Sequence, residues 1–319
     1  MKQVTCLFLI TALALHGQQG KKKKQAALDN PEGPQIVNLG EAKLAGEIPG
    51  ERVSEAEKQS DWPAIAIATD GSLYAIYVVW NDKDADSIVV RRRDPGGKWD
   101  APITIDDGVW DHYSPTIVAR GNGAMAIWSG QAKSGFDLYA AEISPGGKVS
   151  KPTQLTRAPF SDFNARAVSD SAGNVTVVWQ SFRSGNGDIY ARRLSGKSWG
   201  PETRVSTSDA DDWEPAVALD KRGVAWISWD SYHTGNYDVF LRSFDGKKLG
   251  EPIAMTTEPT AQFHSSVAVD GEGRVWVAWD EAGINWGKDF SRSSAAPGSM
   301  GLHHSRSIGL RVYANGRVQ

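Results

Sequence analysis

Aromatic residues recur along this chain at intervals of about 50 residues, and this repeat constrains the fold more than any other feature. One series is spaced by 51, 50, 50 and 50 residues and consists of Trp62, Tyr113, Phe163, Trp213 and Phe263. A second series is spaced by 48, 51, 50 and 50 residues and consists of Trp80, Trp128, Trp179, Trp229 and Trp279. A repeat of this length with strand-like content indicates one four-stranded sheet per repeat, because such a sheet cannot bury both faces alone. The sequence therefore predicts an all-β fold, a five-bladed β-propeller of four-stranded blades.

The third repeat shows how one blade is built. Residues 165–168 alternate small residues with others and suit a crowded innermost strand, and an Asp-x-x-Gly turn leads to a β-branched strand that ends at Trp179. A third strand at 188–192 follows, and the outer strand at 199–206 tolerates its proline because it lies at an edge. We expect the strand-ending tryptophans of the second series to be core residues between blades.

The two ends of the chain complement each other. The fifth repeat stops at Gln319, where the other repeats continue into an outer strand, so we expect it to lack that strand. Glu51-Arg52-Val53-Ser54 parallels Thr203-Arg204-Val205-Ser206 and stands before the first repeat. The sequence predicts a propeller over residues 49–319 whose ring is closed by this N-terminal strand.

The N-terminus resembles an export signal. Lys2, the apolar run 4–15 and the small residues after it have the layout of a secretory signal peptide over residues 1–17, and the run is too short for a membrane span. Cleavage would remove Cys6, the only cysteine, whereas a lipid-anchored Cys6 is the alternative interpretation. Residues 18–48 are polar and aperiodic, and we expect a disordered leader on a secreted or periplasmic protein.

The composition limits the classes of molecule that this protein is expected to bind. A formal net charge of -3 and a pI near 6.1 argue against nucleic acid, and the repeats carry no basic stripe. No His-x-His or cysteine cluster supports a metal site, so we expect no metal and no cofactor. We expect a monomer that binds a glycan or a partner protein.

Departures from the repeat indicate where a ligand binds. Four repeats have loops of about six to eight residues between the second and third strands, whereas the fifth runs from Asp280 to about Ser307. This loop and neighbouring positions on the same face combine carboxylates, an amide and aromatic planes, which suit polar ligands such as sugars. The predicted ligand-binding residues are Asp280, Glu281, Asn285, Trp286, Lys288, Asp289, Trp213, Glu214 and His264.

Three functions fit these residues. The main hypothesis is an exported binding module without chemistry of its own. The first alternative is a glycoside hydrolase or lyase, because a carboxylate pair can be drawn from Asp61, Asp111, Glu214, Asp280 and Glu281. The second is a scaffold, or the recognition half of a larger hydrolase, in which the aromatic and acidic residues only hold the blades together.

Two resemblances extend this interpretation. The Asp-x-x-Gly turns and strand-ending tryptophans resemble those of secreted bacterial propellers of the sialidase-like superfamily over about 51–319, but the Asp-box spacing differs and no arginine triad is present, so sialidase activity is not implied. Trp279-Asp280-Glu281 with residues 285–289 is similar to the propeller that precedes a PHP-type metal-dependent hydrolase domain in large exported bacterial proteins. The histidine-rich metal motifs of that domain are absent.

Overall fold

The computed structural model describes residues 50–81, 84–105, 107–132, 135–283 and 306–319. Arg52–Gln319 forms one compact unit, and of the other unit, Met1–Glu51, only Gly50 and Glu51 are described. The described residues form strands and turns and include no helix that could span a membrane. The predicted signal peptide and most of the polar leader lie outside the described residues.

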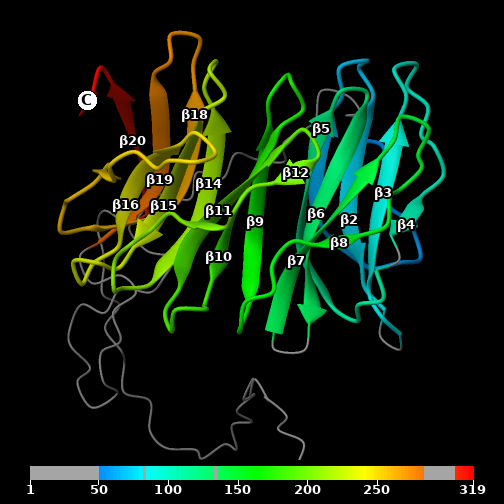
Figure 1. Cartoon of the computed structure of the whole chain (residues 1–319), viewed down its shortest axis with the longest axis horizontal. Helices are drawn as coiled ribbons and strands as arrows, with labels where there is room; N and C mark the ends of the chain where they lie inside the picture. The colour runs from blue at the N-terminus through cyan, green and yellow to red at the C-terminus, as the bar shows by residue number, and fades with distance from the viewer. Residues whose placement is uncertain (1–49, 82–83, 106, 133–134, 284–305) are drawn as a thin grey trace, which may run out of the picture. The chain divides into compact units, whose positions relative to one another are not determined.

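The strands form five antiparallel sheets that follow one another in chain order (Figure 1). The first two sheets contain β1 (Ser60–Ile67), β2 (Leu73–Val79), β3 (Ser87–Arg93) and β4 (Ile103–Ile105), then β5 (His112–Arg120), β6 (Gly123–Ala132), β7 (Gly135–Ile143) and β8 (Thr153–Gln154). The third contains β9 (Asp162–Ser169), β10 (Val175–Ser181), β11 (Asp188–Ser195), β12 (Ser198–Trp199) and β13 (Thr203–Arg204). The last two contain β14 (Asp212–Leu219), β15 (Ala225–Ser231), β16 (Asp238–Phe244) and β17 (Ile253–Ala254), then β18 (Ala261–Val269), β19 (Val275–Ala282), β20 (Ser307–Ala314) and β21 (Arg317–Val318).

The first strand of each sheet lies beside the first strand of the next. This holds from β1 to β5, from β5 to β9, from β9 to β14 and from β14 to β18. Each sheet is therefore innermost at its first strand and continues outward in chain order, which is the propeller architecture that the repeat predicts.

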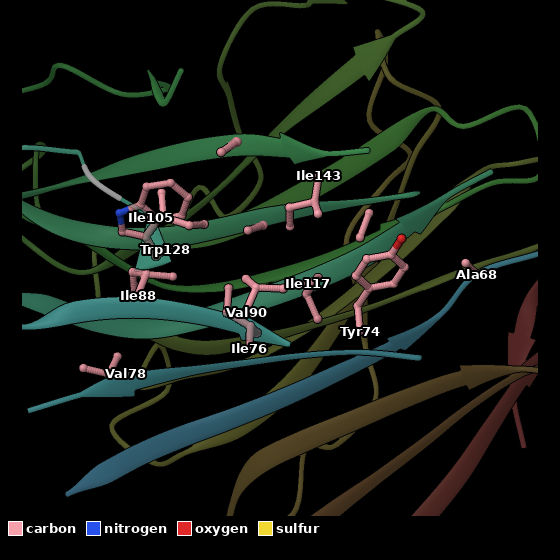
Figure 2. Packing of buried hydrophobic residues seen from close by; sticks show 13 residues of the cluster. Ala68, Tyr74, Ile76, Val78, Ile88, Val90, Ile105, Ile117, Trp128 and Ile143 are labelled. Carbon is pink, nitrogen blue, oxygen red and sulfur yellow. The ribbon is translucent and has the colours of Figure 1, made fainter. Parts of the chain in front are cut away.

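The core lies in the junctions between consecutive sheets. Figure 2 shows the first junction, where Ile88 and Val90 of β3 pack with Ile117 of β5 and Trp128 of β6. Three further apolar clusters repeat this arrangement along the chain. Stability therefore comes mainly from burial between neighbouring sheets, because no sheet of four strands has a core of its own.

An arginine links most sheets to the segment before their first strand. The Nη1 of Arg91 donates to the carbonyl of Val53 at 2.7 Å. Likewise, Arg242 donates to the carbonyl of Val205 and Arg311 to that of Met255, at 2.6 Å each. Arg192 makes the same bond to Leu155. The link is missing from the second sheet, where Ala141 occupies the corresponding register position opposite Ala126.

The predicted tryptophan core is confirmed in four sheets and wrong in the first. Trp128 and Trp179 are 0% exposed, and Trp229 and Trp279 are also buried. Trp80 lies beyond the end of β2 and is 37% exposed. The register explains the error: Tyr77 pairs with Val89 as Trp179 pairs with Tyr190, so Tyr77 is the buried aromatic of the first sheet.

The prediction that the fifth repeat lacks an outer strand holds for the outer part of that strand. β21 has the register of β12, whose Trp199 pairs with Leu194. Among the described residues no strand pairs with Gly309 and Leu310, where β17 pairs with Phe240 and Leu241 of the fourth sheet. β21 pairs with β20 through Tyr313 and Val318, because Asn315-Gly316 with positive φ values of 53° and 78° forms a tight hairpin. The structure assigns no strand to residues 50–59.

Candidate functional site

The innermost strand of every sheet is interrupted at the same place by a bulge. The pairing register with the second strand shifts there, and a residue other than glycine adopts a positive φ of 43° to 54°. These residues are Trp62, Ser114, Asn164, Glu214 and His264. Side chains rarely adopt this conformation, which costs on the order of 1–3 kcal/mol and is found preferentially at functional sites. Trp62 is therefore equivalent to Ser114 in the second sheet, and the residue equivalent to Tyr113 is Asp61.

The bulges of the fourth and fifth sheets bring an imidazole between two carboxylates. The Nε2 of His264 lies 3.5 Å from Oε2 of Glu214, and its Nδ1 lies 3.2 Å from Oδ2 of Asp280. Arg306 Nη1 lies 3.3 Å from the same Asp280 oxygen. The side chains of Glu214 and His264 are about half exposed. We call these four residues the His264 cluster; it can bind polar groups and transfer protons.

A pocket of about 350 Å³ lies against this cluster. Four innermost strands contribute to its lining, which consists of Thr116, Arg166, Ala167, Glu214, Pro215, Ala216, Val217, His264, Ser265, Ser266 and Val267. Arg166 is exposed, and its Nη1 donates to Ser114 Oγ at 3.4 Å and to the carbonyl of Ala165 at 3.1 Å. Within the described part of the chain Arg166 makes no ion pair, so it offers a positive charge to a ligand.

A buried carboxyl group lies beneath the cluster. Asp230 on β15 is 2% exposed, and its Oδ1 accepts a hydrogen bond of 3.2 Å from the backbone N–H of His264. Burial raises the pKa of Asp230 well above its usual range, and the nearby charge of Glu214 raises it further. This carboxyl supports the bulge that presents His264.

We expect Asp230→Asn to stabilise the protein at neutral pH. Because the pKa of Asp230 is raised in the folded state, wild-type stability falls as pH rises from the ordinary aspartate range through the raised value. Asparagine keeps the acceptor for His264 and cannot ionise. Thermal unfolding should give the variant a higher Tm than wild type at pH 7, with the difference vanishing near pH 3. An equal difference at both pH values would contradict this explanation.

The structure brings together three of the predicted ligand-binding residues, Glu214, His264 and Asp280. Asp280 and Glu281 belong to β19 rather than to a loop, because that strand stays paired with β18 as far as Ala282. Glu281 neighbours Asp280 on the strand, and its Oε1 accepts a hydrogen bond from Thr260 outside the cluster. Trp213 packs edge-on against Phe182 instead. The remaining predicted residues, Asn285, Trp286, Lys288 and Asp289, lie outside the described residues.

The ligand-binding residues predicted from the sequence did not include Arg166, Asp230 and Arg306. Arg166 carried a usable signal, because it interrupts a run of small apolar residues in an innermost strand. Asp230 had a weaker one: it follows Trp229 as Asp280 follows Trp279, and only tertiary structure shows that it is buried under His264.

Comparisons with known proteins show similarity at the level of the fold. No protein-family profile matches the sequence, and no curated protein shows significant sequence similarity to it. Among solved structures, an ulvan lyase of the polysaccharide lyase family PL25 has a TM-score of 0.57 and 14% identity over 82% of this chain and 72% of that one. The same kind of lyase bound to -[GlcA(1-4)Rha3S]- has a TM-score of 0.55 and 13% identity, again over 82% and 72% of the two chains.

A protein of unknown function from Dyadobacter fermentans has a TM-score of 0.51 and 12% identity, covering 71% of this chain and 76% of that one. At such identities the similarity concerns the fold. None of these three structures is described as a sialidase or as a PHP-type hydrolase, so both resemblances drawn from the sequence remain predictions.

Proposed function

We propose that this protein is a carbohydrate-active enzyme that binds a polysaccharide in the pocket beside the His264 cluster and cleaves a glycosidic bond there. The observation that carries the proposal is the imidazole of His264 held between the carboxylates of Glu214 and Asp280 at 3.5 and 3.2 Å. Chemistry therefore replaces simple binding as the favoured hypothesis. The fold similarity to a polysaccharide lyase supports this choice.

Hydrolysis is the reaction that a carboxylate pair serves best. One carboxyl group protonates the leaving glycosidic oxygen as the C1–O bond breaks, and the other takes a proton from the water that attacks C1. Glu214 and Asp280 contact opposite nitrogens of a single imidazole, which suits the separation of roughly 5–9.5 Å between the two carboxyl groups of glycosidases. His264 between them can return the proton from the base to the acid after each turnover.

Elimination is a second candidate, and Arg166 favours it. A lyase abstracts the proton beside a uronate carboxylate, forms a C4=C5 double bond and expels the glycosidic oxygen at C4. A guanidinium that holds the uronate carboxylate makes that proton more acidic. Arg166 faces the same pocket without an ion-pair partner in the described residues, and arginine forms strong bidentate bonds to carboxylates and sulfates.

The same proposal includes the features that rest on the sequence alone. We propose that residues 1–17 direct export, that the enzyme acts outside the cytoplasm, and that its five sheets form a closed five-bladed ring. Glycans outside the cell are the substrates to which such an enzyme has access.

The test is a panel of neutral and acidic polysaccharides incubated with the protein. New reducing ends without ultraviolet absorbance of an unsaturated product indicate hydrolysis, and both signals together indicate elimination. Binding on a glycan array without turnover of any polysaccharide would contradict the proposal and restore the binding-module hypothesis. As a specificity control, Arg166→Gln should weaken activity on acidic substrates more than on neutral ones.

A further inference from the structure

A second pocket, of about 200 Å³, lies beside the end of β15 and shares no lining residue with the pocket at the His264 cluster. Its lining includes Asp212, Trp229, Ser231, His233, Phe240 and Pro252, and we call it the Asp212 pocket. Among the described residues that line it there is no lysine or arginine. The pocket thus combines a carboxylate, hydroxyl groups and aromatic rings with no cationic side chain of its own.

The third sheet contains the same positions in the same register. The connections 181–188 and 231–238 have equal length, and each joins paired ends of the second and third strands. Arg183 of the third sheet is therefore equivalent to His233 of the fourth. The other equivalent pairs are Asp162 and Asp212, Trp179 and Trp229, Ser181 and Ser231, Tyr190 and Phe240, and Glu202 and Pro252.

In the third sheet the guanidinium of Arg183 occupies this place. Its Nη2 lies 3.0 Å from each carboxylate oxygen of Asp162, and its Nε donates to Ser181 Oγ at 2.8 Å. Its Cζ lies 4.3 Å from the ring centroid of Tyr190, and its Nη1 donates to Glu202. A carboxylate, a serine hydroxyl and an aromatic ring therefore hold one planar cation there.

The fourth sheet keeps these acceptors but has no guanidinium among them. Asp212 is 0% exposed, and Ser208 Oγ donates to its Oδ2 at 3.1 Å. Ser231 is 1% exposed, and in the described part of the chain its Oγ has no hydrogen-bond partner. Burial raises the pKa of Asp212, which is expected for a carboxylate without a cation beside it. The acceptors that Arg183 satisfies in the third sheet thus await a donor in the fourth.

The space and the ring are retained as well. Phe240 stacks on Trp229 with ring centroids 5.8 Å apart, as Tyr190 stacks on Trp179 at 5.9 Å. His233 is exposed, so the volume that the guanidinium fills in the third sheet is open in the fourth.

We infer that the Asp212 pocket binds the guanidinium group of a ligand, in the place that Arg183 fills in the third sheet. Two parallel N–H groups bond the Asp212 carboxylate, a further N–H bonds Ser231 Oγ, and the plane of the cation lies on Phe240. Pro252 replaces Glu202, so one carboxylate remains and one bound guanidinium balances its charge. An ammonium group suits the pocket less, because it is a compact point charge without the planar fork.

The group can belong to a small guanidine or to an arginine side chain of a polypeptide, and two probes separate these sources. N-ethylguanidinium carries the group alone, and N-acetylarginine amide carries it as a polypeptide does. Saturation-transfer NMR titrations of the wild-type protein should give saturable binding of N-ethylguanidinium, tighter than that of propylammonium. Binding of N-acetylarginine amide as well assigns the pocket to arginine side chains, and its exclusion assigns the pocket to small guanidines. Absence of saturable binding by either guanidinium probe, or equal affinity for propylammonium, overturns the inference.

Substitutions at the pocket locate the bound probe. His233→Arg supplies the guanidinium of the third sheet from the chain itself, and it should abolish binding and raise the Tm. His233→Ala is the matched control, which removes the imidazole without filling the pocket and should bind as wild type does. Asp212→Asn keeps an acceptor for Ser208 and should weaken binding by about 10-fold or more, the usual effect of removing a charge from such a bond. Wild-type affinity in His233→Arg or in Asp212→Asn would place the probe elsewhere and overturn the inference.

The third sheet supplies a positive control for the chemistry. Arg183→Ala opens the equivalent pocket and should lower the Tm, and N-ethylguanidinium should restore part of the loss. If the probe rescues Arg183→Ala while wild type binds none, the Asp212 pocket is not a guanidinium site. Should Arg183→Ala fail to fold, wild type and His233→Arg decide the matter between them, and equal binding by both overturns the inference. No polysaccharide enters these measurements, so their outcome is independent of the proposed function.

Discussion

Glu214→Gln and Asp280→Asn are each expected to lower kcat on the cleaved polysaccharide by about 10²- to 10⁴-fold, the usual contribution of a positioned acid or base. Each change keeps the size of the side chain and removes its ability to exchange a proton. KM should change much less, because the amide can still accept hydrogen bonds from the sugar. Steady-state kinetics on the substrate identified by the polysaccharide panel measures both quantities.

Glu272→Gln is the matched control for these variants. Glu272 lies on a turn of the fifth sheet, its side chain is 74% exposed, and it pairs with Arg274 at 3.2 Å, away from the His264 cluster. Its kcat should equal that of wild type. If Glu214→Gln and Asp280→Asn also keep wild-type kcat while their Tm is unchanged, the two carboxylates take no part in the reaction and the site assignment fails.

Trp179→Ala is expected to lower the free energy of unfolding by about 3–5 kcal/mol, through lost burial and the cavity that remains. Trp179 is 0% exposed and stacks on Tyr190 at 5.9 Å between ring centroids. Its Nε1 donates to Oδ1 of the buried Asp162 at 3.1 Å, so the change also removes a hydrogen bond to a buried carboxylate. Urea or guanidinium unfolding measures the loss, and substrate binding should decline only as the protein unfolds.

Trp80→Ala separates the buried position from the sequence repeat. Trp80 is 37% exposed and contacts Trp62 at 5.1 Å between ring centroids. The variant should lose about 1 kcal/mol or less, as exposed substitutions usually do. A loss equal to that of Trp179→Ala would show that the sequence spacing, and not the register of β2, identifies the core aromatic of the first sheet.

The fold followed from the sequence because repetition is a property of the chain itself. Strand-ending tryptophans at intervals near 50 residues required repeated sheets, and repeated sheets bury their faces only by packing on one another. The innermost strands were also predictable, since alternating small residues at 165–168 and 216–218 fit a crowded position next to two other sheets.

Register within the first sheet was not predictable. Trp62 and Trp80 fit the 50-residue spacing of the two aromatic series. The chain nevertheless pairs Asp61 with Val78 and Tyr77 with Val89, so neither tryptophan occupies the position that its series predicts. One residue of slip exchanges the faces of a strand, so a repeat count accurate to two residues cannot say which aromatic is buried.

For the site, the sequence by itself determined which residues were candidates: it selected Asp280 from the long fifth segment between the second and third strands, and Glu214 and His264 from neighbouring positions on the same face. Only the tertiary structure decided that they meet. Glu214 and His264 are 50 residues apart in the sequence and become neighbours because each occupies the strained bulge of an innermost strand and those strands lie side by side. The tertiary structure also decided that Asp230 is buried and that Arg166 makes no ion pair with the described residues. Desolvation and ion pairing depend on what the surrounding sheets place around a group, and a sequence pattern does not contain those distances.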